Sequence, residues 1–177
     1  MQLSENFFLA EFVRSDLALR RGIDNTPDIQ QIMNLKFLCE NILQPLRDKF
    51  GPIVISSGFR SFALNRAVGG SASSQHMLGE ACDIRIPSIE VGKEYFEFLK
   101  ALPVFDQLIW ERLSPKSSVY WIHVSIKRRG NNRKQVIPLL ELTINTTNAT
   151  TKGKNTLKVI VTDRIGNTTI KEWTLLF

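Results

Sequence analysis

Two histidines and one aspartate in this sequence have the residue types and spacing of a metal site. His76 and Asp83 lie seven residues apart, and His123, the only other histidine, follows forty residues later. Neutral imidazole and carboxylate groups are donors that zinc takes, and three protein ligands leave one position open for water. An open position is typical of a catalytic rather than a structural zinc site, so we predict a catalytic centre at these residues.

Two short strands must position these side chains. Alternation over residues 119–126 places Trp121 and His123 on one face and the apolar residues on the other. The same rule over the expected strand 81–86 places Asp83 opposite its apolar neighbours. Both candidate ligands therefore face away from the apolar side, toward a cleft, whereas a core histidine would lie among apolar residues.

Three motifs resemble those of a known family. Residues 74–83, SQHMLGEACD, resemble the motif S-x-H-x-x-G-x-A-x-D of the zinc D-Ala-D-Ala carboxypeptidase family, which includes related L-Ala-D-Glu endopeptidases of peptidoglycan. Residues 56–61, SSGFRS, are similar to its S-S-G-[YF]-R-S segment, and residues 121–125 to the segment that supplies its last histidine. The resemblance covers residues 3 to about 134.

The resemblance implies an α+β fold, with a small antiparallel sheet and flanking helices, and a Zn²⁺ ion held by His76, Asp83 and His123. It also implies a zinc peptidase that cuts peptidoglycan stem peptides next to a D-amino acid, as a carboxypeptidase or an endopeptidase. Arg60 would hold a substrate carboxylate or stabilise the oxyanion. Ser74 and Trp121 are expected to contact substrate, with capping of the motif turn as the alternative role of Ser74.

A general base is needed as well, and here the sequence departs from the family pattern. That pattern places Glu or Asp three residues before the last histidine, and this chain has Tyr120 there. We predict instead that Glu111, on a strand that forms a hairpin with that of His123, is the base, with Glu80 as the next candidate. The departure also favours an alternative function, a non-catalytic wall-binding module or a structural component of a phage particle. A zinc hydrolase acting on another amide is a third alternative.

The scaffold is expected to contain two principal helices. Thr26 is predicted to cap the first, which begins at Pro27 and ends near Phe50, with a break just before Pro45. The second is expected over residues 88–102.

The character of the chain changes after Lys134. We predict a peptidase-like domain over residues 1–134 and a β-rich appendage over 135–177, for attachment to a virion or a second copy of the chain. Strands are expected at 136–144, 156–162 and 168–177. The basic run 127–134 indicates either a solvated turn or a surface that attracts anionic wall polymer.

Composition narrows the remaining classes. The net charge of +6 favours an anionic partner, but no nucleic-acid-binding motif is present. Cys39 and Cys82 are too few and too far apart for a disulfide framework, and both are expected to be buried. The N-terminus lacks a signal-peptide pattern and no run reaches membrane-spanning length, so we expect a cytoplasmic protein released to the wall, as an endolysin is, or packaged in a phage particle.

Overall fold

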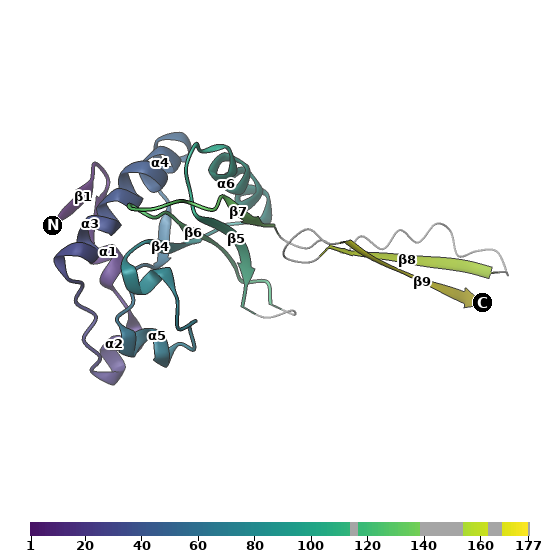
Figure 1. The fold of residues 1–177 in the computed structure, drawn as a ribbon, viewed down its shortest axis with the longest axis horizontal. Helices are drawn as coiled ribbons and strands as arrows, with labels where there is room; N and C mark the ends of the chain where they lie inside the picture. Colours follow the sequence, from purple (N-terminus) through teal and green to yellow (C-terminus); the bar gives the residue numbers. More distant parts are fainter. Residues whose placement is uncertain (114–116, 139–153, 163–167, 177) are drawn as a thin grey trace. The chain divides into compact units, whose positions relative to one another are not determined.

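The computed structural model describes residues 1–113, 117–138, 154–162 and 168–176. The chain divides into two compact units, Met1–Val136 and Ile137–Phe177. The first unit combines antiparallel sheet with helices, which confirms the predicted α+β class (Figure 1).

A five-stranded sheet forms the centre of the first unit, with strand order β3-β4-β6-β5-β7. Its β3/β4, β4/β6 and β5/β6 pairs are antiparallel, so the predicted hairpin is present. The strands are β3 (Val54–Ser57), β4 (Ala81–Arg85), β5 (Gln107–Arg112), β6 (Tyr120–Ser125) and β7 (Gln135–Ile137).

The register of the sheet places the two strand-borne candidate ligands side by side. Asp83 on β4 pairs with His123 on β6, and Ile109 on β5 pairs with His123 from the other side. Side chains alternate between the two faces of a sheet, so these three share one face. The opposite face supplies core residues that are all buried, namely Cys82, Ile84, Leu108, Trp110, Ile122 and Val124.

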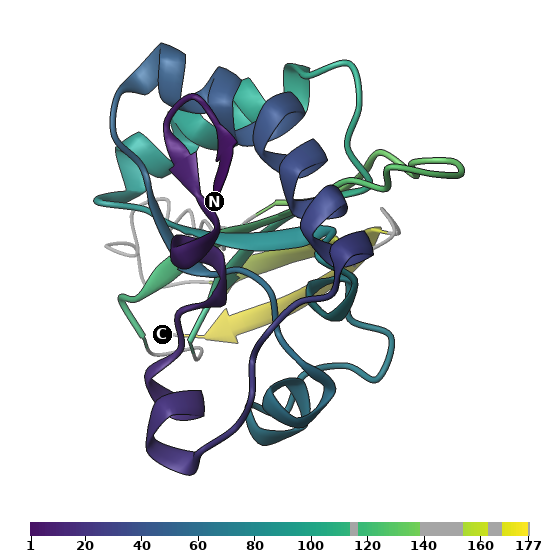
Figure 2. The same ribbon diagram turned by 90° about the vertical axis from the view of Figure 1, so that its left-hand side faces the viewer.

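Helices cover the apolar face of the sheet. Helix α6 (Ile89–Ala101) contacts β5 and β6, and α4 (Gln44–Phe50) contacts α6. Figure 2 shows them with α3 (Ile29–Leu38) on one side of the sheet. The predicted break before Pro45 is confirmed, because a π-helical turn, η1 (Cys39–Leu43), separates α3 from α4.

The start of α3 differs from the prediction. Asp28, not Thr26, is the N-cap: its carboxylate accepts from the backbone N–H of Gln31, and the Gln31 side chain accepts from the N–H of Asp28. This reciprocal capping box satisfies two N–H groups that a helix start leaves unpaired. Thr26 instead donates to Asp24 through its hydroxyl and its backbone N–H.

The N-terminal segment and the motif region add smaller elements. Phe7 and Phe12 are fully buried and pack edge to face, which docks the N-terminus on the unit. Helices α2 and α5 lie on the side of the sheet away from α4 and α6 (Figures 1 and 2). These elements are β1 (Gln2–Ser4), β2 (Phe7–Phe8), α1 (Leu9–Val13), α2 (Asp16–Arg21), α5 (Phe62–Ala67) and the 3₁₀ turn η2 (Gln75–Leu78).

The second unit contains an antiparallel pair, β8 (Lys154–Thr162) and β9 (Thr168–Leu176). The register runs from Lys154 opposite Leu176 to Thr162 opposite Thr168. Both strands lie where strands were predicted. Most of the strand expected over 136–144 lies outside the described residues. In the part of the chain that the structure describes, no helix is long and apolar enough to cross a bilayer.

Candidate metal centre

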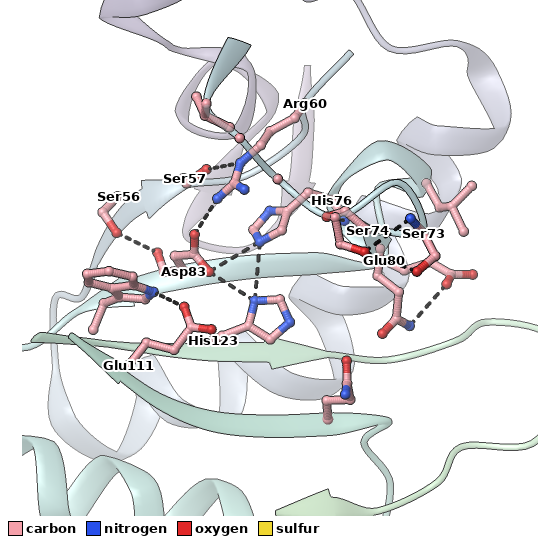
Figure 3. Close-up of a pocket in the computed structure, with 18 of the residues that line it drawn as sticks. Ser56, Ser57, Arg60, Ser73, Ser74, His76, Glu80, Asp83, Glu111 and His123 are labelled. Carbon is pink, nitrogen blue, oxygen red and sulfur yellow. Dashed lines mark hydrogen bonds and ion pairs between the residues drawn. The ribbon is translucent and has the colours of Figure 1, made fainter. Parts of the chain in front are cut away.

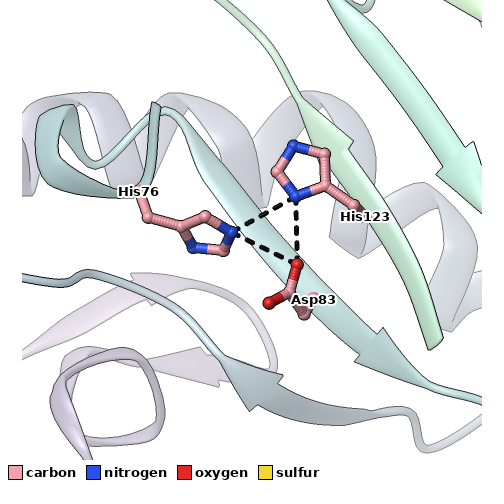
Figure 4. Close-up of side chains that lie close together, drawn as sticks. All are labelled: His76, Asp83 and His123. Carbon is pink, nitrogen blue, oxygen red and sulfur yellow. Dashed lines mark hydrogen bonds and ion pairs between the residues drawn. The ribbon is translucent and has the colours of Figure 1, made fainter. Parts of the chain in front are cut away.

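The three predicted ligands meet at one point on the polar face of the sheet (Figure 4). His76 Nε2 lies 3.2 Å from His123 Nδ1 and 3.2 Å from Asp83 Oδ1, and His123 Nδ1 lies 3.0 Å from the same Asp83 oxygen. The side chains of His76 and Asp83 are 4% and 9% exposed, and that of His123 is 12% exposed. The three side chains are therefore largely buried, and that of His123 is the most exposed of them.

These separations fit a zinc ion. Donors placed about 2.0–2.1 Å from a tetrahedral ion lie about 3.3 Å from one another. The three observed separations, 3.0 to 3.2 Å, are close to that edge length. Two imidazoles and one carboxylate are also the donor types of catalytic zinc sites, so the expected cofactor, Zn²⁺, fits the residues present.

A hydrogen bond to the backbone orients His76 for this role. Its Nδ1 lies 2.7 Å from the carbonyl oxygen of Gly58, which requires the proton to be on Nδ1. The Nε2 lone pair is then directed at Asp83 and His123. Gly58 itself is packed tightly against Phe12, because a Cβ there would lie 2.6 Å from the Cα of Phe12.

The turn that carries His76 is fixed by its own cap and by α3. The Ser74 hydroxyl accepts from the backbone N–H of His76 at 3.4 Å, which is the capping role considered for it. Gln31 donates to the Met77 carbonyl at 3.0 Å, and Asn34 donates to the Leu78 carbonyl at 2.8 Å. These bonds satisfy carbonyl groups at the end of the turn that have no partner within it.

Gly79 closes the same turn in the left-handed conformation, with φ of 69°. A Cβ at this position would lie 2.4 Å from the carbonyl oxygen of Gln31. The motif therefore needs glycine here for both its backbone angle and the close approach of α3.

Arg60 binds the carboxylate of Asp83 through the oxygen that faces away from the histidines. Its Nη2 donates to Asp83 Oδ2 at 2.6 Å, and its Nε donates to the Ser57 hydroxyl at 2.8 Å. Oδ1 of Asp83 is thereby left to face the histidines. Burial alone would raise the pKa of Asp83, but the adjacent His76 and His123 reverse this and hold that pKa below its usual range.

Glu111 and Trp121 form a pair beside the site. They lie directly opposite each other on β5 and β6, and the Trp121 indole Nε1 donates to Glu111 Oε2 at 2.6 Å. Tyr120, the residue at the family's usual base position, packs its ring against Trp110 on the helix-covered face. Tyr120 therefore points away from His123, as alternation along the strand requires.

A cleft of about 1060 Å³ lies over the three ligands and contains every predicted site residue (Figure 3). This volume suits a peptide-sized ligand. The residues that line it include Ser56, Ser57, Arg60, Ser74, Gln75, His76, Glu80, Asp83, Gln107, Glu111, Trp121, His123, Lys127 and Arg133.

Several supporting groups were not anticipated from the sequence. The Gly58 carbonyl and the Ser57 hydroxyl lie in the SSGFRS motif, which indicated this region but not which atoms act. Gln31 and Asn34 lie on a helix expected to serve only as scaffold, and their contacts with the motif turn span more than forty residues. No local sequence pattern reports contacts of that range.

The fold and the donor set define the class of this protein: an α+β domain with a three-ligand mononuclear metal site at the floor of an open cleft. A family model described as peptidase M15 matches residues 5–125, and the chain belongs to this peptidase family. A segment of 44 residues is 46% identical to the zinc D-Ala-D-Ala carboxypeptidase of Streptomyces albus G. That segment is 24% of this chain and only 17% of the relative's length.

Proposed function

We propose that this chain is a zinc-dependent peptidase that hydrolyses peptidoglycan stem peptides next to a D-amino acid. The observation that carries the proposal is the convergence of His76, Asp83 and His123 beneath a peptide-sized cleft, in a member of a peptidase family. The Streptomyces relative, a D-Ala-D-Ala carboxypeptidase by name, supports the substrate class.

His76, Asp83 and His123 would hold the ion through Nε2, Oδ1 and Nδ1. When bound there, zinc would supply Lewis acidity to a coordinated water and to the scissile carbonyl. The hydrogen bond from His76 Nδ1–H to the Gly58 carbonyl keeps the ring turned toward the site, so ligand geometry does not have to form during catalysis.

Glu111 is the proposed general base. Its Oε2 accepts from Trp121, and Oε1 has no hydrogen-bond partner among the described residues, so it can take the proton of the attacking water. Glu111 lies on the same face two residues along β5 from Ile109, the residue that pairs with His123, which is about 7 Å along the strand. A glutamate side chain reaching toward the ligands covers part of this distance, and one bridging water covers the rest.

Arg60 has two proposed roles. It positions Asp83 through Nη2, and it lines the cleft, so its Nη1 group is available to a substrate carboxylate or to the developing oxyanion. A guanidinium suits both because it stays charged at all working pH values and offers several fixed donors.

Mass spectrometry of purified muropeptides after incubation with the zinc-loaded protein tests the proposal. Loss of a terminal alanine would identify a carboxypeptidase, and fragments from within the stem would identify an endopeptidase. The His123→Ala variant should leave the same muropeptides unchanged. Intact muropeptides with the wild-type protein would overturn the peptidase proposal, and retained binding of those peptides would then favour the wall-binding alternative.

For the biological setting, we propose a protein that reaches the wall after release from a cell or as part of a phage particle. Residues 135–177 contain none of the candidate ligands, and the hairpin of β8 and β9 is joined in sequence to the peptidase unit. A two-stranded hairpin is marginally stable alone, so attachment to a larger assembly or a second copy is the proposed role of this segment.

A further inference from the structure

The cleft extends beyond the metal ligands on two sides of the sheet face. Along β6, Trp121 and Ser125 flank His123 two residues away in opposite directions, and they pair with Glu111 and Gln107 on β5. Figure 3 shows Glu111 and Glu80 on opposite sides of the two histidines. The side near Gln107 and Glu80 contributes nothing to the chemistry proposed above, yet it lines the same cleft.

Two cations are held at that far side by a buried acid. Asp106 is fully buried, and Lys127 Nζ lies 3.2 Å from its Oδ1. Arg133 grips the same carboxylate, with Nε at 3.1 Å from Oδ1 and 3.0 Å from Oδ2 and with Nη2 bonded to Oδ2 as well. The Lys127 and Arg133 side chains nevertheless remain 31% and 49% exposed. They are therefore fixed in place while keeping N–H groups for a ligand.

An acidic residue, Glu80, lies on the same side of the cleft. Arg133 Nη2 donates to Gln75 Oε1 at 3.4 Å, and Gln75 Nε2 donates to Glu80 Oε2 at 3.2 Å. The other Glu80 oxygen has no hydrogen-bond partner among the described residues. Burial raises the pKa of Glu80, while Gln75 and Lys127 act in the opposite direction. Gln75 thus lies between the negative Glu80 and the positive pair of Lys127 and Arg133 along one side of the cleft.

The balance of charge points to the kind of ligand. The formal charges of Lys127 and Arg133 are cancelled by those of Asp106 and Glu80. A simple anion would be attracted by Lys127 and Arg133 but repelled by Glu80. A simple cation would be attracted by Glu80 but repelled by Lys127 and Arg133. A ligand group that carries an ammonium and a carboxylate a few ångströms apart satisfies both.

We propose that Lys127, Arg133 and Glu80 form a subsite for a side chain that ends in both an ammonium and a carboxylate group, as diaminopimelic acid does. The inference rests on the proposed function, since it assumes that a stem peptide occupies the cleft. Stem peptides carry either such a residue or plain lysine at the same position. Glu80 lies three residues before Asp83, about 10 Å along an extended chain, which a residue one position away from the cleaved bond can span with its side chain.

Synthetic stem peptides that differ only at this residue test the subsite. The set contains diaminopimelic acid, its side-chain amide, and lysine. With the zinc-loaded full chain, kcat/KM should be about 10- to 100-fold higher for the free acid than for the other two, as expected for losing a charge-assisted hydrogen bond. Calorimetric Kd values with the Glu111→Gln variant, which should turn over slowly, provide a readout independent of cleavage and should show the same order.

Two variants assign the preference to these residues. Lys127→Met should reduce the difference in Kd between the diaminopimelic acid peptide and its amide, while leaving Asp106 paired with Arg133. Glu80→Gln should reduce the difference in Kd between the diaminopimelic acid peptide and the lysine peptide. Lys100→Met, at an exposed lysine of α6 that pairs with Glu97 at 3.3 Å, is the matched control and should keep both differences.

The outcomes separate this inference from the proposed function. Equal Kd values for the three peptides would overturn the subsite even if all are cleaved. Loss of cleavage of every peptide to the same extent in Glu80→Gln would also overturn it, because Glu80 would then act in the reaction. Failure of the wild type to cut any peptide would overturn the peptidase proposal, while ordered Kd values would still support the subsite.

Discussion

The Trp121 indole donates a 2.6 Å hydrogen bond to Glu111 across directly paired positions of β6 and β5. This bond ties the proposed base to the strand that carries His123. A glutamate at a strand end ordinarily samples several rotamers, and the indole restricts Glu111 to one arrangement on the cleft face. The sequence predicted the hairpin of these two strands but not the bond.

The first prediction is that Glu111→Gln retains zinc and peptide binding yet loses turnover by a factor of about 10² to 10⁴, because the amide cannot accept a proton from the attacking water. Single-turnover cleavage, zinc content and peptide Kd are the measurements. Trp121→Phe is the companion variant. It keeps the Glu111 carboxylate but removes the hydrogen bond that orients it, so the loss of turnover should be smaller than in Glu111→Gln. A Glu111→Gln protein that cuts at the wild-type rate would exclude Glu111 and make Glu80 the next base to test.

The second prediction concerns the metal. Purified wild-type protein loaded with zinc should contain about one ion per chain, because the structure brings together one set of three donors among the described residues. His123→Ala should lose most of this zinc while keeping its circular dichroism spectrum, since the side chain lines the cleft on the polar face of the sheet and is not part of the apolar core. Elemental analysis decides the question, and a metal-free wild type after zinc loading would refute the site.

The strand-borne part of the candidate metal site could be predicted from the sequence because it depends on local alternation. Alternation placed Asp83 and His123 each opposite the apolar side of its strand, and the register of β4 with β6 pairs these two residues directly. The helix boundary at Thr26 was wrong because Asp28 also satisfies the capping pattern, with Gln31 three residues on, and the reciprocal cap prevailed.

What the sequence did not predict depends on contacts between distant segments. The run 127–134 showed only positive charge, and its two possible interpretations were a solvated turn and a wall-binding surface. The contacts that fix Lys127 and Arg133 involve Asp106, more than twenty residues earlier, and nothing local in the sequence indicates that Asp106 is completely buried.

The third prediction compares two glycines that share a positive φ. Gly79→Ala should destabilise the protein by the left-handed backbone cost of about 1–2 kcal/mol plus the cost of a Cβ that meets the Gln31 carbonyl at 2.4 Å. Gly69→Ala bears only the backbone cost, because nothing lies within 4 Å of its Cβ position. Urea unfolding of both variants measures the difference. Equal destabilisation would show that contact with α3 does not constrain the motif turn.

The fourth prediction concerns acid stability through Asp106. Burial alone would raise the pKa of this carboxyl, but its hydrogen bonds with Arg133 and Lys127 prevail and lower it. A lowered folded-state pKa means that the stabilisation is fully present above the unfolded value of about 3.9 and is lost as the pH falls through the lower folded value. Asp106→Asn should therefore be less stable than wild type at about pH 7, and this difference should shrink below about pH 4.

Thermal unfolding of both chelator-treated proteins across that range checks the sign. Chelation removes the separate pH dependence of metal binding from the comparison. A stability difference that stays constant down to about pH 3 would mean that Asp106 ionisation is not linked to folding.

The last prediction concerns where the peptidase unit ends. A chain that stops after Pro138 should fold and bind zinc as the full chain does, because all candidate ligands and cleft-lining residues among the described residues precede this point. Stopping at Lys134 instead removes β7, the neighbour of β5, together with the 2.7 Å bond from Gln107 to Gln135 and the Gln135 N–H bond to the Asp106 carbonyl. We expect the shorter chain to unfold at a lower temperature, and both to lose any association with a second copy or a virion that the full chain shows.

Zinc content, thermal unfolding and light scattering of the three chains provide the comparison. If the chain ending at Pro138 is insoluble or metal-free, residues beyond it belong to the peptidase core and the proposed division of the chain is wrong.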